Sequence, residues 1–343
     1  MRRPPQPPPA SAPPPPPPPR KPRHTPPPPP RPPAPPPTPP PPPPPHPPTL
    51  AVIAGPCALE SLELSLTVAD RLRGLTADLG LPYIFKGSFD KANRTSAGSS
   101  RGPGLEQGLE ILSNVRERLA VPVTTDLHEP WQAPKVATAV DLLQIPAFLC
   151  RQTDLLEAAS HAAAQHSRAI NIKKGQFLSP AEMAGPVAKC QAAGCHNLLL
   201  TERGTFFGYH RLVTDLIGLG DLMQLNPQEP PQHDHTVGPS SGRRGGPPVC
   251  YDATHSAQLP GAGNAAGQTT SAGRGERVPL LARAAVATGV DAVFIECHPD
   301  PPNAASDRDT MVPLQRMPEL LQTLARVADA VGRPNAPQAI NRP

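Results

Sequence analysis

From Thr49 onward, the chain alternates short, nearly continuous apolar runs with longer stretches whose apolar positions recur at helical spacing. Apolar runs of this kind are typical of parallel strands that are buried on both faces. Eight runs are predicted to be strands, at residues 50–55, 82–87, 122–128, 142–148, 169–174, 197–203, 249–255 and 292–298. Eight helices are predicted between and after them, at residues 62–79, 105–119, 131–139, 153–166, 180–193, 210–223, 278–288 and 312–331.

Eight successive β/α units predict a closed (β/α)₈ barrel of the α/β class rather than an open, doubly wound sheet. A barrel of this kind takes about 250 residues as one domain, and residues 49–335 provide that length. No Gly-x-Gly-x-x-Gly sequence follows the first predicted strand, which disfavours a dinucleotide-binding fold.

Four segments depart from the regular pattern. In residues 1–48 about two-thirds of the positions are proline and none is acidic, so this arm is predicted to be disordered because it has too little apolar surface to offset its ordering entropy. Residues 225–247 are predicted to be a disordered, catalytically neutral insertion at the end of the barrel opposite its mouth. Residues 258–277 are rich in glycine and alanine and are predicted to overhang the mouth and affect its closure. Residues 336–343 are predicted to be a flexible tail.

The charge and the cysteines narrow the function classes. The arm carries six basic residues, so of the formal charge of +4 the rest of the chain holds −2, and a nucleic-acid-binding face is not expected. No apolar run approaches the roughly 18 residues that span a bilayer, and the arm lacks the apolar segment of a secretory signal. Six scattered cysteines indicate reduced thiols, so we expect a cytoplasmic protein.

Polar side chains stand at the carboxyl end of every predicted strand. In a barrel these ends converge on one mouth, where catalytic groups are expected. The residues in question are Cys57, Lys86, Lys91, Asp126, His128, Gln144, Lys173, Lys174, Gln176, Glu202, Arg203, Asp252, His255, Glu296 and His298.

Several of these residues are cations, which suits a small substrate with phosphate and carboxylate groups. The acids at the strand ends are expected to be too few to neutralise them all, although any single cation has an ion pair as its alternative role. The cationic set is Lys86, Lys91, Arg94, Lys173, Arg203 and Arg151.

A second set, Cys57, His255, Glu296 and Asp307, combines a thiolate, an imidazole and two carboxylates. These donors suit a borderline divalent ion such as Fe²⁺, Zn²⁺ or Mn²⁺. Barrel closure brings the first, seventh and eighth strands together, but the four residues form no compact spacing motif. Asp309 is an additional acid that is expected to compete for the metal or to reinforce its binding.

Nearly all of residues 50–331 resemble the KDO-8-phosphate synthases, a family close to the 3-deoxy-heptulosonate-phosphate synthases; KDO is 3-deoxy-D-manno-octulosonate. The specific stretches are Ala-Gly-Pro-Cys-Ala-Leu-Glu-Ser at 54–61, Phe-Lys-Gly-Ser-Phe-Asp-Lys-Ala-Asn-Arg-Thr-Ser at 85–96, Arg-Gly-Pro-Gly at 101–104, Gln-Ile-Pro-Ala-Phe-Leu-Cys-Arg-Gln-Thr-Asp at 144–154, Asn-Ile-Lys-Lys-Gly-Gln-Phe at 171–177, Glu-Arg-Gly-Thr at 202–205, Asp-Ala-Thr-His-Ser at 252–256 and Phe-Ile-Glu-Cys-His-Pro-Asp-Pro at 294–301. The Lys-Ala-Asn-Arg element at 91–94 resembles the octulosonate branch, whereas the heptulosonate branch typically has Lys-Pro-Arg-Thr.

The resemblance implies the condensation of phosphoenolpyruvate with D-arabinose 5-phosphate. It implies that Lys91, Lys173 and Arg203 bind phosphoenolpyruvate, helped by Gln144 and the backbone of Ala147. It also implies that Asn93 holds sugar hydroxyls, that Arg94 and Thr95 take the aldose phosphate, and that Arg151 reaches a neighbouring subunit of a homotetramer. Cys57 at this position resembles the metal-dependent branch, which implies that His255, Glu296 and Asp307 complete the ligand set.

The expected catalytic residues are Lys91, Asp126 and His255. Lys91 is placed to stabilise a developing alkoxide. Asp126 and His128 are candidates for sugar contacts or proton transfer, with the orientation of Lys91 as an equally plausible role, so the general base stays unassigned.

Two other functions remain open. One is a heptulosonate-phosphate synthase that uses erythrose 4-phosphate. The other is a non-catalytic barrel whose proline-rich arm recruits SH3-, WW- or profilin-type partners, although its Pro-x-x-Pro matches follow from composition alone.

Overall fold

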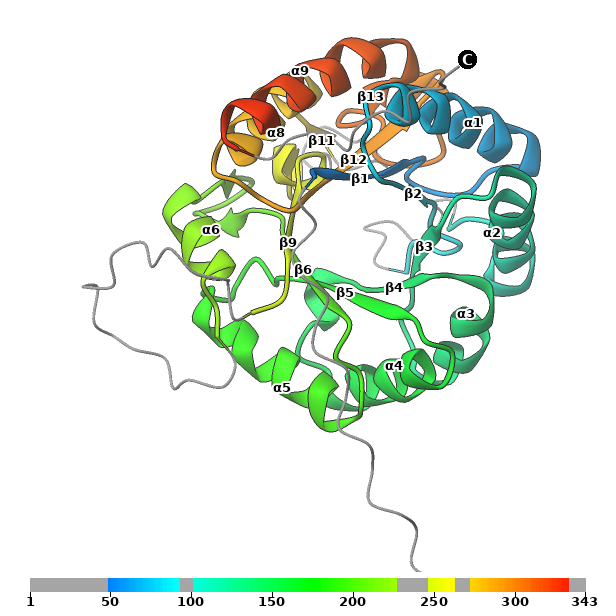
Figure 1. Cartoon of the computed structure of the whole chain (residues 1–343), viewed down its shortest axis with the longest axis vertical. Coiled ribbons are helices and arrows are strands. Elements are labelled where there is room, and N and C mark those ends of the chain that lie inside the picture. The colour runs from blue at the N-terminus through cyan, green and yellow to red at the C-terminus, as the bar shows by residue number, and fades with distance from the viewer. Residues whose placement is uncertain (1–48, 93–100, 227–245, 263–271, 333–343) are drawn as a thin grey trace, which may run out of the picture. The chain divides into compact units, whose positions relative to one another are not determined.

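The computed structural model describes residues 49–92, 101–226, 246–262 and 272–332. Within these residues, parallel strands form a closed barrel inside a ring of helices (Figure 1). The strands pair in the order β1-β2-β3-β4-β5-β6-β9-β12, and β12 pairs with β1 to close the ring. The predicted (β/α)₈ barrel is therefore confirmed.

The elements follow the predicted alternation closely. The barrel strands are β1 (Ala51–Gly55), β2 (Tyr83–Lys86), β3 (Val123–Asp126), β4 (Leu142–Ile145), β5 (Ala169–Lys173), β6 (Leu198–Glu202), β9 (Val249–Asp252) and β12 (Ala292–His298). The helices around them are α1 (Leu62–Asp78), α2 (Leu105–Leu119), α3 (Ala133–Ala139), α4 (Thr153–Gln165), α5 (Ala184–Ala192), α6 (Leu216–Met223), α8 (Val278–Ala287) and α9 (Met317–Ala330).

Five short strands complete the described fold. β7 (Thr205–Phe206) pairs antiparallel with β8 (Leu212–Val213), and β10 (Gln258–Leu259) pairs antiparallel with β11 (Ala272–Gly273). β13 (Val312–Pro313) extends the sheet beside the end of β12.

The predicted helices at 210–223 and 312–331 are wrong in their first turns. In the first case the β7–β8 hairpin occupies residues 205–213, and α6 begins only where the side chain of Asp215 accepts the backbone N–H groups of Ile217 and Gly218. In the second case Val312 and Pro313 pair with β12, and α9 begins at Met317.

The apolar faces of the helices pack on the outside of the barrel. On α2 the buried positions include Leu109, Leu112 and Val115, which recur every three residues and so lie on one face. Burying one such leucine stabilises the fold by about 1.5–3 kcal/mol. A separate cluster of Ile53, Leu142, Cys250, Ala292 and Phe294, from β1, β4, β9 and β12, packs inside the barrel, because β4 lies on the opposite side of the ring from the other three strands.

Gly55 allows the ends of β1 and β2 to approach each other. A Cβ atom at this position would lie 2.0 Å from the carbonyl oxygen of Lys86. A larger residue would therefore push apart the two strands that carry Cys57 and Lys86 into the mouth.

The predicted disordered arm at 1–48 and the predicted tail at 336–343 lie outside the described part of the chain, as do residues 227–245 of the predicted insertion and residues 263–271 of the segment predicted to overhang the mouth. The two ends of the insertion are described and meet, since a Cβ atom on Gly246 would lie 1.8 Å from the carbonyl oxygen of Leu225. Among the described helices, none combines the length and the apolar character needed to cross a bilayer.

Candidate active site

The carboxyl ends of the barrel strands open onto a pocket of about 440 Å³. This is the end at which (β/α)₈ barrels carry their active sites. Among the predicted site residues, its wall contains Lys86, Lys91, Asp126, Ala147, Lys173, Arg203, His255 and Asp307.

A groove of about 620 Å³ lies between α8 and α9, with arginines and acids in its wall. Asp309 lines this groove and is absent from the wall of the mouth pocket. The expectation that Asp309 acts beside Asp307 on the metal is therefore not supported, because the two residues line different cavities and Asp309 is exposed.

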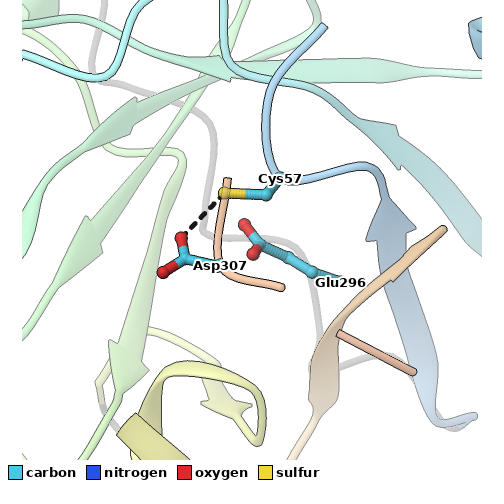
Figure 2. Close-up of side chains that lie close together, drawn as sticks. All are labelled: Cys57, Glu296 and Asp307. Carbon is cyan, nitrogen blue, oxygen red and sulfur yellow. Dashed lines mark hydrogen bonds between the residues drawn. The ribbon is translucent and has the colours of Figure 1, made fainter. Parts of the chain in front are cut away.

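Cys57, Glu296 and Asp307, of which Asp307 lines the mouth pocket, come together in the structure although they lie far apart in sequence (Figure 2). One ligand atom of each lies within 4.8 Å of the others, and all three residues are buried. The thiol of Cys57 donates to Oδ2 of Asp307 at 2.8 Å. Oε2 of Glu296 has no hydrogen-bond partner among the described residues. A buried thiol, two carboxylates and an unsatisfied carboxylate oxygen fit a borderline divalent ion.

His255 faces these three residues from the neighbouring strand end. Its Nε2 lies 3.7 Å from Oε1 of Glu296 and 4.0 Å from Oδ2 of Asp307. Its Nδ1 lies 2.7 Å from Oδ2 of Asp252. Because the carboxylate only accepts, Nδ1 donates in this contact, which leaves Nε2 as the ring nitrogen on the side of Glu296 and Asp307. This pairing is the usual way in which a carboxylate orients a metal-binding histidine.

The backbone of Asp307 adopts a left-handed conformation, with φ of 46°. Its carbonyl oxygen accepts the backbone N–H groups of Thr310 and Met311, at 3.1 and 3.2 Å. A non-glycine residue at such a φ costs free energy. The turn therefore holds the carboxylate of Asp307 towards Cys57 against a local backbone preference.

The charges of the pocket act on these side chains. Burial, reinforced by Asp307 and Glu296, raises the pKa of Cys57 well above its usual value. Burial also tends to raise the pKa of Glu296, but Lys86, His255 and Lys91 outweigh it and lower that pKa. The ligand set therefore holds the protonated thiol of Cys57 beside the ionised carboxylate of Glu296, and a bound cation would favour loss of the thiol proton.

The lysines at the mouth have acidic partners. Lys86 Nζ lies 2.6 Å from Oε1 of Glu296, and Lys173 Nζ lies 2.7 Å from Oδ2 of Asp252. For these two lysines the alternative role in an ion pair is confirmed, because each meets an acid from the strand two places away in the barrel. Lys173 also stacks on the ring of Phe294, with Nζ 3.9 Å from the ring centroid.

Lys91 takes part in a different contact. Its Nζ donates to Oγ of Ser88 at 3.0 Å, and Ser88 donates to Oδ2 of Asp126 at 2.6 Å. Burial tends to lower the pKa of Lys91, but Cys57, Glu296 and Asp126 outweigh it and raise that pKa. Burial likewise tends to raise the pKa of Asp126, but Lys91 and Lys86 lower it. Both groups are therefore charged at neutral pH.

Gln144 lies beneath this pair in a buried chain of hydrogen bonds. Its amide nitrogen donates to Asp126, its oxygen accepts from Asn171 at 2.9 Å, and Thr201 donates to Asn171 at 2.6 Å. Gln144 itself is absent from the wall of the mouth pocket. In this arrangement it orients Asp126, and the backbone of Ala147 borders the cavity.

Arg203 is buried, and one nitrogen of its guanidinium, Nη1, has no hydrogen-bond partner among the described residues. The other, Nη2, donates to Oε1 of Gln258 at 2.8 Å. Burial lowers the pKa of Arg203, but an arginine keeps its proton near neutrality. The unpaired Nη1 is therefore a donor for an anion in the pocket.

The remaining predicted residues lie elsewhere. Arg151 is exposed and does not line the mouth pocket. Asn93, Arg94 and Thr95 lie outside the described residues. His128 lines the pocket beside Asp126, and burial lowers its pKa, so it is neutral at pH 7.

Three residues in these contacts were given no role from the sequence, although Asp252 was counted among the polar residues at the strand ends. Ser88 links Lys91 to Asp126, Asp252 orients His255, and Gln258 contacts Arg203. The signals were weak but present: Asp252 ends a strand, and Gln258 follows His255 by three residues, one turn of a 3₁₀ helix.

Comparison with known proteins identifies a family and several relatives. The sequence profile of the DAHP synthetase I family matches residues 47–332. Proteins named 2-dehydro-3-deoxyphosphooctonate aldolase are close relatives. The one from Granulibacter bethesdensis is 49% identical over 284 residues, which cover 82% of this chain and 90% of the relative. Those from Alkalilimnicola ehrlichii and Bradyrhizobium sp. are 47% and 49% identical and cover 82% and 85% of this chain, and 92% of each relative.

Proposed function

This chain belongs to the DAHP synthetase I family, and we propose that it condenses phosphoenolpyruvate with D-arabinose 5-phosphate and water to give 3-deoxy-D-manno-octulosonate 8-phosphate and inorganic phosphate. This is the activity of the octulosonate branch, to which the names of its relatives point. The enzyme is a transferase of KDO biosynthesis.

The observation that carries the proposal is the composition of the mouth pocket. Lys91, Arg203 and Asp307 line one cavity, and Asp307 also belongs to the buried ligand set with Cys57 and Glu296. Cationic donors suit the phosphate and carboxylate of phosphoenolpyruvate. A metal-binding corner beside them suits the oxygens of an aldehyde or of water.

In the reaction, a bond forms between C3 of phosphoenolpyruvate and the aldehyde carbon of the aldose. The aldehyde oxygen gains a proton, water adds at C2, and the C2–O bond to phosphate breaks. Arg203 and Lys173 hold the phosphoenolpyruvate, and the unpaired Nη1 of Arg203 is the available donor. Holding two substrates in a reactive geometry lowers the activation free energy by roughly 7–11 kcal/mol in favourable cases.

Lys91 is the residue that we assign to the aldehyde oxygen. It is positively charged and is held by Ser88, so its ammonium group is oriented before the substrate arrives. Asp126 keeps this arrangement in place and, with His128, faces the same pocket, where sugar hydroxyls would bind. Asn93, Arg94 and Thr95 are assigned to the aldose and its phosphate by resemblance alone.

Cys57, His255, Glu296 and Asp307 would hold the divalent ion. When bound, such an ion polarises a carbonyl oxygen or orients a water molecule. Asp252 sets the tautomer of His255, and Lys86 neutralises one oxygen of Glu296. Fe²⁺, Zn²⁺ and Mn²⁺ all accept this mixture of donors.

The nearest alternative is the use of erythrose 4-phosphate, the aldose of the heptulosonate branch. Two observations favour the octulosonate branch: the names of the relatives and the Lys-Ala-Asn-Arg element at 91–94. A non-catalytic scaffold is disfavoured, because the buried charges of the mouth cost free energy that a packing surface does not need.

We also propose a homotetramer in the cytoplasm. Phe148, Phe177, Phe206 and Phe207 are each at least 43% exposed, and they belong to the segments that follow β4, β5 and β6. Phe206 donates its backbone N–H to the carbonyl of Gln176, so two of these segments are in contact. Exposed aromatic side chains in one region are typical of subunit interfaces, and the six free cysteines suit a reducing compartment.

The test is phosphate release from phosphoenolpyruvate with each aldose phosphate in turn, with and without a chelator. Activity with arabinose 5-phosphate that the chelator abolishes is the expected result. A preference for erythrose 4-phosphate would reverse the branch assignment, and activity with neither aldose would refute the enzyme. Sedimentation of the purified protein measures the oligomeric state, and a monomer would refute the tetramer.

A further inference from the structure

The side chain of Gln258 lies between Arg203, a proposed ligand of phosphoenolpyruvate, and Asp307, a proposed ligand of the metal. Its Oε1 accepts from Nη2 of Arg203 at 2.8 Å, and its Nε2 donates to Oδ1 of Asp307 at 2.9 Å. One amide therefore contacts both a proposed phosphoenolpyruvate ligand and a proposed metal ligand.

The chemistry of the two neighbours fixes the orientation of this amide. A guanidinium only donates, so it must meet the amide oxygen, and the carboxylate of Asp307 only accepts here, so it must meet the amide nitrogen. A flipped amide would place NH₂ against Nη2 and oxygen against carboxylate, which loses both bonds. Each hydrogen bond also has a charged partner, and such bonds are stronger than neutral ones.

The backbone of Gln258 is held on both sides. Its N–H closes the short 3₁₀ turn on the carbonyl of His255, another proposed metal ligand. Gln258 then begins β10 and pairs with Gly273 of β11. The amide is thus carried by the same turn as His255 and has little freedom to move independently.

Arg203, at one end of this bridge, has an unsatisfied atom, and so does Glu296, which belongs to the ligand set of Asp307 at the other end. Within the described residues, Nη1 of Arg203 and Oε2 of Glu296 have no hydrogen-bond partner. An anion that binds Nη1 would pull the guanidinium towards itself, and an ion at the ligand set would orient the carboxylate of Asp307. Since the two groups share Gln258, ordering one of them orders the other.

We propose that Gln258 is a positioning residue that couples binding of phosphoenolpyruvate to binding of the metal. This proposal rests on the proposed function, because it takes Arg203 as a phosphoenolpyruvate ligand and Asp307 as a metal ligand. The side chain of Gln258 contacts Arg203 and Asp307 and is not assigned to the reacting atoms. Its role is to make simultaneous binding of both ligands stronger than the two separate affinities predict.

The coupling is a measurable factor. By thermodynamic linkage, phosphoenolpyruvate must tighten Zn²⁺ binding by the same factor by which Zn²⁺ tightens phosphoenolpyruvate binding. The factor is obtained from Zn²⁺ titrations of the metal-free full chain against a chromogenic chelator, with and without phosphoenolpyruvate. Without an aldose no turnover takes place, so the readout is binding rather than activity. Calorimetry with phosphoenolpyruvate provides the reciprocal measurement.

Two variants test the bridge. Gln258→Met keeps the length of the side chain and removes both hydrogen bonds, whereas Gln258→Glu keeps an acceptor for Arg203 and loses the donor to Asp307. The matched control is Gln315→Met, which removes an exposed amide bonded to the carbonyl of Pro299. The wild type and the control are expected to show a coupling factor of about fivefold or more, the lower end of common couplings. Both Gln258 variants are expected to reduce that factor at least threefold. The direct attraction between anion and cation accounts for what remains.

The outcomes separate the two proposals. If the wild type binds both ligands and either variant of Gln258 keeps the full coupling factor, the bridge is refuted while the proposed function stands. If the wild type shows no coupling, the bridge is refuted as well. If the wild type binds no phosphoenolpyruvate, the proposed function falls and the bridge falls with it. If Gln258 had only a structural role, its replacement would lower the melting temperature and the affinities for both ligands but would leave the coupling factor unchanged.

Discussion

Nζ of Lys86 lies 2.6 Å from Oε1 of Glu296, and both side chains are buried. The same ammonium group also donates to the carbonyl oxygen of Cys57 at 2.7 Å. Lys86 is thus bound to two of the residues that form the proposed metal site. The carboxylates of Glu296 and Asp307 are buried, so water screens their charge poorly, and the ammonium group of Lys86 neutralises part of it.

Replacement of Lys86 tests this balance. Lys86→Met leaves the carboxylate of Glu296 buried without its cation, which is expected to destabilise the metal-free protein by about 3–5 kcal/mol. Zn²⁺ should restore part of the loss by supplying a positive charge at the same carboxylate. Urea unfolding with and without Zn²⁺ measures both effects.

The control for Lys86 is Lys135→Met on α3, whose partner Glu106 is exposed. Exposed ion pairs contribute at most about 1 kcal/mol. Equal losses in the two variants would mean that the buried pair has no special role in the mouth.

The thiol of Cys57 is expected to be essential for metal binding. Cys57→Ser replaces a soft thiolate by a hydroxyl that does not ionise. Loss of a residue that only orients a metal ligand already costs about tenfold in affinity, so the affinity for Zn²⁺ should fall by at least about tenfold. Removal of metal with a chelator should abolish activity of the wild type. Cys195→Ser, in a buried cysteine that bonds only weakly to the carbonyl of Asn197, serves as the control. Undiminished activity in the presence of chelator would contradict the assigned role of Cys57.

His128 predicts a pH dependence of stability. Burial lowers its pKa in the folded protein, so the folded state binds fewer protons here than the unfolded chain, whose histidines titrate near 6.5. The contribution of this group is fully present above about pH 6.5 and is lost as the pH falls through the lower folded-state pKa. The slope for one proton cannot exceed about 1.4 kcal/mol per pH unit.

Unfolding by urea between pH 8 and pH 5 measures this term. His128→Gln should flatten the fall on the acidic side, whereas His161→Gln on α4, an exposed histidine, should leave it unchanged. A steeper fall in the His128 variant would show that the sign is opposite.

The close approach at Gly55 predicts opposite effects for two glycines. Gly55→Ala would place a Cβ atom 2.0 Å from the carbonyl oxygen of Lys86, and overpacking of this kind typically costs about 1–3 kcal/mol. It should also weaken Zn²⁺ binding, because Cys57 follows two residues later. Gly74→Ala in α1 meets nothing within 4 Å, so it should stabilise the protein by about 0.5–1 kcal/mol. Thermal unfolding of both variants tests the contrast, which would fail if the two changes shifted stability in the same direction.

The amino-acid sequence by itself determined the architecture. Barrel strands such as β1 and β12 are runs of β-branched and aliphatic residues, which favour burial on both faces of the sheet. The amphipathic stretches between the strands bury their apolar faces by packing on that sheet as helices. It missed the starts of α6 and α9, because residues 205–213 and 312–313 take their hydrogen bonds from distant or neighbouring strands rather than from a local helix. Local periodicity does not carry that information.

The chemistry of the mouth was only partly determined by the sequence. Residue types at the strand ends indicated the cations and the ligand set, since every parallel strand of a barrel ends at the same mouth. Only the tertiary structure decided the partners: Lys86 with Glu296, Lys173 with Asp252, and Gln258 between Arg203 and Asp307. These pairs join residues up to 210 positions apart, and their geometry depends on the register of barrel closure and on side-chain torsions, which no local pattern encodes.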